Sequence, residues 1–264
     1  MITLHVQADP PGRPPLLLVH GFLSSRNHWQ LNGLSDAFRC IRVDLPGHGR
    51  SPAPDDPALY HPDALVGALE AVRRDLGIDR WFICGQSFGA GLTLRYALSH
   101  PDRVTAQCFT NANAALREAW TPDLLAAHER RIASVAEDGH AALRRFPYHP
   151  AHARRFPAAI RATLAADADG CDITGILHLM RHAMPRLSVM DRFAQTRVPT
   201  LLVNGLRERS FQPARDRAAR ALPAMAVVDL EGGHSVNIEA PAAFDTALTG
   251  FFLTGTPHAT QTTG

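Results

Sequence analysis

Lysine is absent from the sequence: all 27 basic residues are arginine, and with 25 acidic residues they leave a net charge of +2. So small a charge disfavours a nucleic-acid partner, because phosphate backbones are bound by strongly basic surfaces. We interpret the exclusive use of arginine as a bias of base composition. Arginine clusters still bind carboxylates and phosphates, so individual guanidinium groups remain candidates for ligand binding.

Long hydrophobic runs and paired cysteines are also lacking. No stretch approaches the roughly 18 apolar residues of a membrane span, and residues 1–5 do not resemble the start of a secretory leader. The four cysteines form no CxxC pair, so we expect buried free thiols: Cys40, Cys84, Cys108 and Cys171. These absences predict a cytoplasmic protein with no membrane partner.

Short apolar runs alternate with helical patterns along most of the chain. Leu65, Leu69, Val72 and Leu76 have the spacing of one helix face, which Gly77 would end. Six runs are predicted as strands: residues 16–19, 40–43, 81–84, 104–109, 200–203 and 226–229. This alternation predicts an α/β fold with a mostly parallel central sheet and helices on both faces.

The alternation stops in residues 114–193, where segments rich in Ala, Arg and His predict helices and no strand. We expect this segment to be a helical cap, inserted into a discontinuous core of residues 1–113 and 194–264. The small, polar residues 254–264 predict a disordered tail.

The segment from Gly85 to Gly89 contains the strongest chemical signal, a Gly-x-Ser-x-Gly pattern centred on Ser87. It lies between a predicted strand and a helix-permissive stretch, the context of a sharp turn that lifts a serine out of the sheet. Serine is a poor nucleophile unless a base lies within hydrogen-bond reach and a third group orients that base.

Two residues further along the chain could supply those roles. His234 follows the last predicted strand, and Glu208 follows the strand of residues 200–203. Both would project from the carboxyl ends of their strands, where open α/β sheets build their sites. The chain order Ser87, Glu208, His234 is that of a serine hydrolase of this architecture.

Four motifs together identify a family resemblance. Besides the segment around Ser87, they are His20-Gly21-Phe22, the run from Asp44 to Ser51 (DLPGHGRS) and the run from Gly233 to Pro241 (GHSVNIEAP). The chain resembles the α/β-hydrolase fold family over nearly its whole length. The resemblance implies a nucleophile elbow at Ser87 and an oxyanion hole formed by the backbone N–H groups of Phe22 and Phe88.

The proposed acid departs from the usual pattern of the family. Most members carry Asp three residues after the glycine that ends this strand, whereas Glu208 occupies that position here. No acid follows the strand of residues 104–109, the other place that relatives use. The alternative interpretation of Glu208 is a solvated loop residue between Arg207 and Arg209.

Other candidates are weaker. Trp29, Trp120 and Arg117 are predicted to line a substrate pocket, although core packing explains Trp29 equally well. The i, i+3 pair His149 and His152 is interpreted as solvated cap surface rather than a metal site, since no third ligand joins it. Asp44, His20 and His48 are interpreted as structural parts of their turns, and Arg117, Arg144, Arg145, Arg154, Arg155 and Arg181 as cap arginines, one of which could reach a substrate carboxylate.

The sequence therefore predicts an esterase or lactonase that acts on a small molecule without a cofactor or a metal, as a monomer or small homo-oligomer. It looks similar to enol-lactonases after His234 and to acyl-homoserine lactonases around Glu208. Aspartate-nucleophile relatives, such as epoxide hydrolases, are disfavoured by serine at position 87. A carbon–carbon bond hydrolase, a lyase and a hydrolase-fold binding protein remain alternatives.

Overall fold

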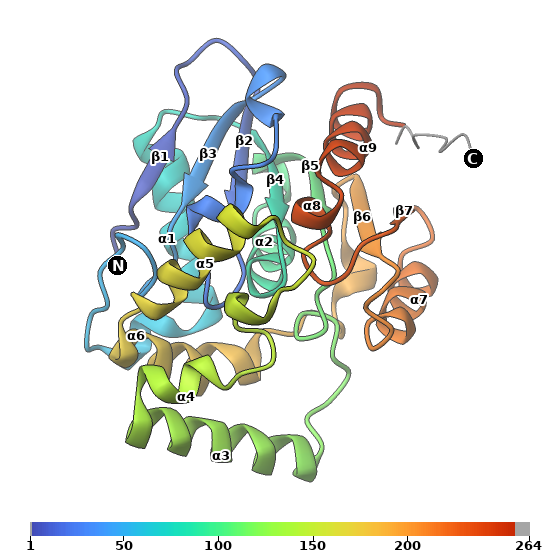
Figure 1. Ribbon diagram of the computed structural model, residues 1–264. Coiled ribbons are helices and arrows are strands. Elements are labelled where there is room, and N and C mark those ends of the chain that lie inside the picture. Colours follow the sequence, from blue (N-terminus) through green and yellow to red (C-terminus); the bar gives the residue numbers. More distant parts are fainter. Residues whose placement is uncertain (1, 257–264) are drawn as a thin grey trace.

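The structure is a computed structural model that describes residues 2–256. A twisted central sheet has helices packed against it on both faces (Figure 1). Its strands are β1 (Val6–Ala8), β2 (Pro15–Val19), β3 (Arg39–Val43), β4 (Trp81–Gly85), β5 (Val104–Phe109), β6 (Thr200–Gly205) and β7 (Ala226–Leu230). The helices are α1 (Pro62–Asp75), α2 (Phe88–Ser99), α3 (Pro122–Asp138), α4 (His140–Arg144), α5 (Ala158–Asp169), α6 (Ile173–His178), α7 (Gln212–Ala221), α8 (Val236–Glu239) and α9 (Pro241–Thr254).

The strand order is β1-β3-β2-β4-β5-β6-β7, with β1 antiparallel to β3 and the other pairs parallel. The predicted α/β fold with a mostly parallel sheet is confirmed, and all six predicted strands are present. Strand β1 was not predicted; it has three residues and no buried position. An apolar pattern could not reveal such an edge strand.

The alternation of side chains along β2 shows how the sheet is buried on both faces. Leu17 and Val19 belong to the apolar cluster under α1 and α2, while Leu16 and Leu18 belong to the cluster under α9. Successive side chains of a strand point to opposite faces, so a continuous apolar run is what a doubly covered strand requires. Each fully buried leucine contributes about 2 kcal/mol.

Helices α3 to α6 lie between β5 and β6 in the chain, and the described residues of this segment contain no strand. Figure 1 shows them gathered at one end and side of the sheet. Residues of this segment form an apolar cluster together with Leu23 of the loop after β2: Leu23, Ile132, Val135, Ala142, Leu143, Phe146, Ala168, Cys171, Ile176 and Met180. The helical content agrees with the expectation for residues 114–193, whereas their status as a separate cap domain stays a prediction.

The chain end differs in part from the prediction of a tail at 254–264. Thr254 is the last residue of α9, and residues 257–264 lie outside the described residues. In residues 2–256, no helix is both long and apolar enough to cross a membrane. The cysteines are buried free thiols, as predicted.

Candidate active site

Ser87 occupies a strained turn between β4 and α2. Its φ of 52° and ψ of −112° lie outside the regions that side-chain-bearing residues favour. The neighbouring glycines allow this turn, because a Cβ on Gly85 would come within 2.6 Å of Ala90 Cα and one on Gly89 would overlap the carbonyl oxygen of Val19. The turn therefore presents the Ser87 side chain at the carboxyl end of the sheet, where it lines a cavity.

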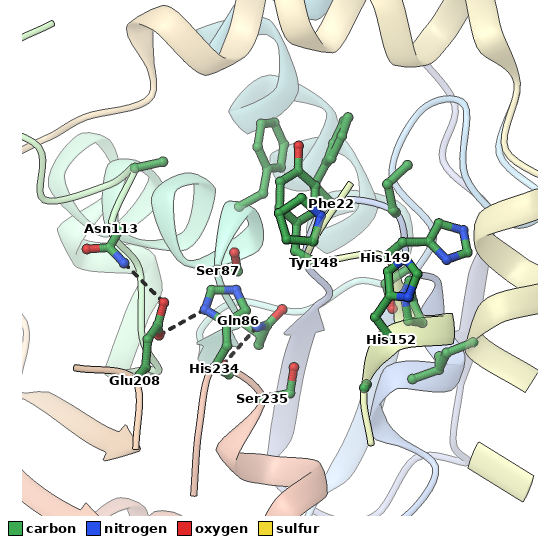
Figure 2. A pocket seen from close by; sticks show the side chains of 18 of the residues that line it. Phe22, Gln86, Ser87, Asn113, Tyr148, His149, His152, Glu208, His234 and Ser235 are labelled. Carbon is green, nitrogen blue, oxygen red and sulfur yellow. Dashed lines mark hydrogen bonds and ion pairs between the residues drawn. The ribbon is translucent and has the colours of Figure 1, made fainter. Parts of the chain in front are cut away.

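His234 and Glu208 meet at the same end of the sheet. His234 Nδ1 lies 2.9 Å from Glu208 Oε2, and Asn113 Nδ2 donates to Glu208 Oε1 at 3.1 Å (Figure 2). Burial acts to raise the pKa of the Glu208 carboxyl, but the hydrogen bond and charge of His234 outweigh it and hold that pKa below its ordinary value. Glu208 is thus an ionised, largely buried carboxylate bonded to the imidazole, and not a solvated loop residue.

The loop that carries His234 is fixed by hydrogen bonds on both sides. Glu239 Oε2 accepts from the N–H of Gly233 at 3.0 Å, and the Gln86 amide donates to the carbonyl of His234 at 3.2 Å. Gln86 immediately precedes Ser87, so the elbow and the histidine loop are tied to each other. The sequence pattern assigned neither side chain a role: the fold brings Gln86 to this loop, and Glu239 lies within the motif of His234 but turns back to Gly233 only in the folded loop.

Ser87, His234 and Glu208 lie together on one wall of the cavity (Figure 2). A hydrogen bond between Ser87 and His234 is not among the contacts of the described residues. Such bonds are often long in a protein without substrate and shorten when the reacting complex forms, so the group remains a candidate triad.

Phe22 and Phe88, predicted to supply the oxyanion hole, both line the cavity beside Ser87, and their ring centroids are 6.3 Å apart. A hydrogen bond to the His48 side chain holds the loop after Phe22 in place. His48 Nε2 accepts from the N–H of Leu23 at 3.1 Å, and Leu23 has a φ of 55°. This contact gives His48 the structural role that its turn predicted.

His20 and Asp44 are structural as well. His20 Nε2 accepts from the N–H of Leu45 at 2.9 Å. The buried Asp44 carboxylate accepts from the backbone N–H of Arg26 and of Arg50 and pairs with the Arg26 guanidinium at 2.7 Å. These bonds close the turns around the site and leave neither side chain facing the cavity.

The cavity has a volume of about 680 Å³ and lies between the ends of the strands and the segment that contains α3 to α6. Trp120 and Arg117 line it, as expected. Trp29 does not: it is fully buried and packs against Phe244 and His28. The prediction that Trp29 lines the pocket is therefore wrong, and core packing explains this residue.

The interpretation of His149 as solvated surface is also wrong. Its side chain is 1% exposed, it lines the cavity, and its Nε2 lies 3.5 Å from Asp169. His152, its neighbour in the pair, is exposed and lines the cavity too. In residues 2–256, no group of three or more His, Cys, Asp or Glu side chains is arranged to hold a metal ion.

Comparisons with known proteins agree with this architecture. A family model described as alpha/beta hydrolase fold matches residues 14–241. A probable proline iminopeptidase of Streptomyces coelicolor is 37% identical over 49% of this chain and 44% of its own length. Epoxide hydrolase 2 of Siraitia grosvenorii is 38% identical over 40% of this chain and 34% of its own length. The matches thus span less than half of either curated relative.

A solved structure extends the likeness to nearly the whole fold. The enol-lactonase of Burkholderia xenovorans superimposes with a TM-score of 0.81 and 25% identity, over 95% of this chain and 96% of that one.

Proposed function

The chain belongs to the α/β-hydrolase fold family, and we propose that it is a cofactor-independent serine hydrolase of carboxylic esters or lactones. The observation that carries the proposal is the 2.9 Å contact between His234 Nδ1 and the buried Glu208 carboxylate, on the same cavity wall as the strained Ser87. A carboxylate at Nδ1 leaves Nε2 free to accept a proton, and that is the tautomer a serine nucleophile needs.

In the proposed first step, His234 Nε2 takes the proton from Ser87 Oγ while Oγ attacks the acyl carbon. The carbonyl oxygen becomes negatively charged, and the backbone N–H groups of Phe22 and Phe88 bind it. Preorganised donors of this kind contribute about 3 kcal/mol each to the transition state. The imidazolium formed at His234 is stabilised by Glu208.

The second half of the reaction reverses these proton movements. His234 gives its proton to the leaving oxygen, which departs as an alcohol, or stays attached as the hydroxyl of an opened lactone. His234 then removes a proton from water as the water oxygen attacks the acyl–Ser87 ester, and it returns that proton to Ser87 Oγ when the ester bond breaks. The products are the carboxylic acid and free Ser87, so no cofactor or metal enters the balance.

Glutamate in the position of the usual aspartate is accommodated by Asn113. The longer side chain needs a second anchor, and the Asn113 amide supplies one at Glu208 Oε1 while Oε2 contacts His234. The Glu208 loop is itself closed by the N–H of Glu208, which lies 3.3 Å from the carbonyl of Gly205. These contacts support the assignment of Glu208 as the acid.

We assign substrate selection to residues 114–193, as a helical cap on the core of residues 1–113 and 194–264. The cavity beside Ser87 takes much of its lining from this segment, including Trp120, His128 and Tyr148. The likeness to an enol-lactonase favours a small ester or lactone. The serine at position 87 argues against the aspartate chemistry of epoxide hydrolases.

Fluorophosphonate labelling followed by mass spectrometry tests the proposal. We expect one adduct, on Ser87, in the wild type and none in Ser87→Ala. Ser99→Ala is the matched control, because Ser99 ends the same helix α2 and does not line the cavity. An unlabelled Ser87 would show the proposal to be wrong. A labelled Ser87 without hydrolysis of any ester or lactone in a panel would favour the carbon–carbon hydrolase or lyase alternative.

A further inference from the structure

The cavity carries more positive than negative charge. Its arginines are Arg117, Arg131, Arg154 and Arg155, and its acids are Glu208 and Glu239. Both acids are already engaged, since Glu208 is bonded to His234 and Glu239 to Arg155. A ligand that fills the cavity therefore meets an excess of guanidinium charge.

The described contacts that hold Arg117 in place do not include an acidic partner for its guanidinium. Its guanidinium carbon lies 4.1 Å from the centre of the Trp120 ring, and its backbone carbonyl accepts from the Ser188 hydroxyl at 2.6 Å. Stacking on an aromatic face fixes the plane of the guanidinium but leaves its N–H edges free to donate. No ion pair or side-chain hydrogen bond of Arg117 is present among the described residues.

Arg131 places a second cation near the first. It lies on α3, three residues after His128, whose ring packs against Trp120 with 5.1 Å between centroids. Burial, and then the charge of Arg131, lower the pKa of the Arg117 guanidinium. In the described part of the chain, Arg131 has no acidic partner either. Arg131 is solvent-exposed yet lines the cavity, so the pair extends from the interior to the solvent.

We propose that Arg117 and Arg131 bind a carboxylate on the substrate, remote from the bond that Ser87 attacks. The substrate class is then a carboxylate-bearing ester or lactone, and this inference rests on the proposed hydrolase function. An isolated pair of like charges is unfavourable at short range, and an anion between them removes the repulsion. The planar guanidinium matches the two oxygens of a carboxylate, which gives direction as well as attraction.

Matched esters test the proposal. The probes are 4-nitrophenyl monoesters of glutarate, adipate and suberate, compared with analogues whose far carboxylate is replaced by a neutral carboxamide. We expect wild type to prefer the acid over the amide in kcat/KM by about tenfold or more at one chain length, as a charge-assisted hydrogen bond provides. Arg117→Gln and Arg131→Gln should each reduce that preference several-fold.

The control is Arg130→Gln, because Arg130 is exposed on the same helix beside Arg131 and does not line the cavity. It should keep the wild-type preference, and Arg117→Lys, which retains the charge but not the planar fork, should keep part of it. Equal kcat/KM values for acid and amide at every chain length in wild type would overturn the proposal. So would a preference that persists in the Arg117→Gln/Arg131→Gln double variant.

Binding separates this proposal from the proposed function. Titration calorimetry with adipate needs no turnover, so the carboxylate site is tested even if no ester is hydrolysed. Binding that is lost in Arg117→Gln and retained in Arg130→Gln supports the site, whereas unchanged binding in Arg117→Gln overturns it. Inorganic phosphate is titrated in parallel, and tighter binding of phosphate than of any dicarboxylate would replace carboxylate as the class.

Discussion

The two walls of the cavity satisfy their charges in opposite ways. On the wall built by the strand ends, Glu208 is bonded to His234 and its charge is matched within the protein. On the wall built by the helical segment, Arg117 and Arg131 have no carboxylate among their described contacts. The charge on the first wall is paired without a ligand, whereas under our proposal the charges on the second wall are paired only when a carboxylate ligand binds. Chemistry and selectivity should therefore respond to different substitutions.

The largest effect is expected for Glu208→Gln. An amide at this position could donate to His234 Nδ1 and hold the wrong tautomer, and loss of the orienting carboxylate lowers kcat by about 10³- to 10⁴-fold in serine triads. The measurement is kcat for a neutral 4-nitrophenyl ester, on which the control Arg130→Gln, outside the cavity lining, should act like wild type. If Glu208→Gln stays within about tenfold of wild-type kcat, Glu208 is not the acid.

Acid should destabilise the folded protein through three buried histidines near the strand-end wall: His20, His28 and His48. Burial lowers the pKa of His28 and of His48 to about 3 and that of His20 to about 4, from 6.5. The unfolded chain binds these protons as the pH falls below 6.5, and the folded chain does not. The free energy of unfolding is thus complete above that pH and falls towards pH 3–4, by up to about 1.4 kcal/mol per pH unit for each histidine. Burial raises the pKa of Asp245 to about 6, so the folded chain takes up this proton before the unfolded chain does. Below pH 6 this uptake stabilises the folded state and offsets the loss from one histidine.

Urea unfolding at pH 7, 6, 5 and 4 measures this dependence. The variant His48→Gln keeps an acceptor for the N–H of Leu23 but cannot take up a proton. Its free energy of unfolding should fall less steeply with acid, by about 1.4 kcal/mol per pH unit relative to wild type. The same slope in both proteins would contradict the assignment of His48 as a buried neutral acceptor.

The smallest effects on kcat are expected at the ion pair of Glu239 and Arg155, where the two partners should contribute differently. Glu239 is 6% exposed and accepts from the N–H of Gly233, whereas its partner Arg155 is 53% exposed. Glu239→Gln should lower kcat about tenfold, because the loop before His234 loses a charged acceptor. Arg155→Gln should change kcat less than threefold or so, since exposed ion pairs contribute about 0–1 kcal/mol. Equal losses in the two variants would show that the ion pair, and not the loop bond, orders His234.

The sequence predicted the strand-end wall well, because its signals are local. Ser87 follows an apolar run within a Gly-x-Ser-x-Gly pattern, and Glu208 and His234 follow later apolar runs. Each pattern predicts a side chain at the carboxyl end of a strand. The contact of Glu208 with His234 confirms that two of these places adjoin. The short edge strand β1 was missed because its three residues carry no apolar pattern.

The helical wall was predicted poorly, because its residues meet through packing between helices. His149 is buried although it lies in no helical pattern, and Arg131 lines the cavity although no motif singles it out. A pattern of 3.6 residues identifies the buried face of a helix, but not which other helix will cover it. Trp29 shows the converse error, since a large aromatic residue near a motif belongs to the core.

The backbone of Ser87 has a consequence for the energy of the whole fold. A residue with a side chain at a φ of 52° and a ψ of −112° costs roughly 1–3 kcal/mol, which the surrounding sheet and helices must supply. The native state has a margin of only about 5–15 kcal/mol over the unfolded chain. The geometry that turns the Ser87 hydroxyl towards the cavity thus consumes a measurable part of the protein's resistance to unfolding.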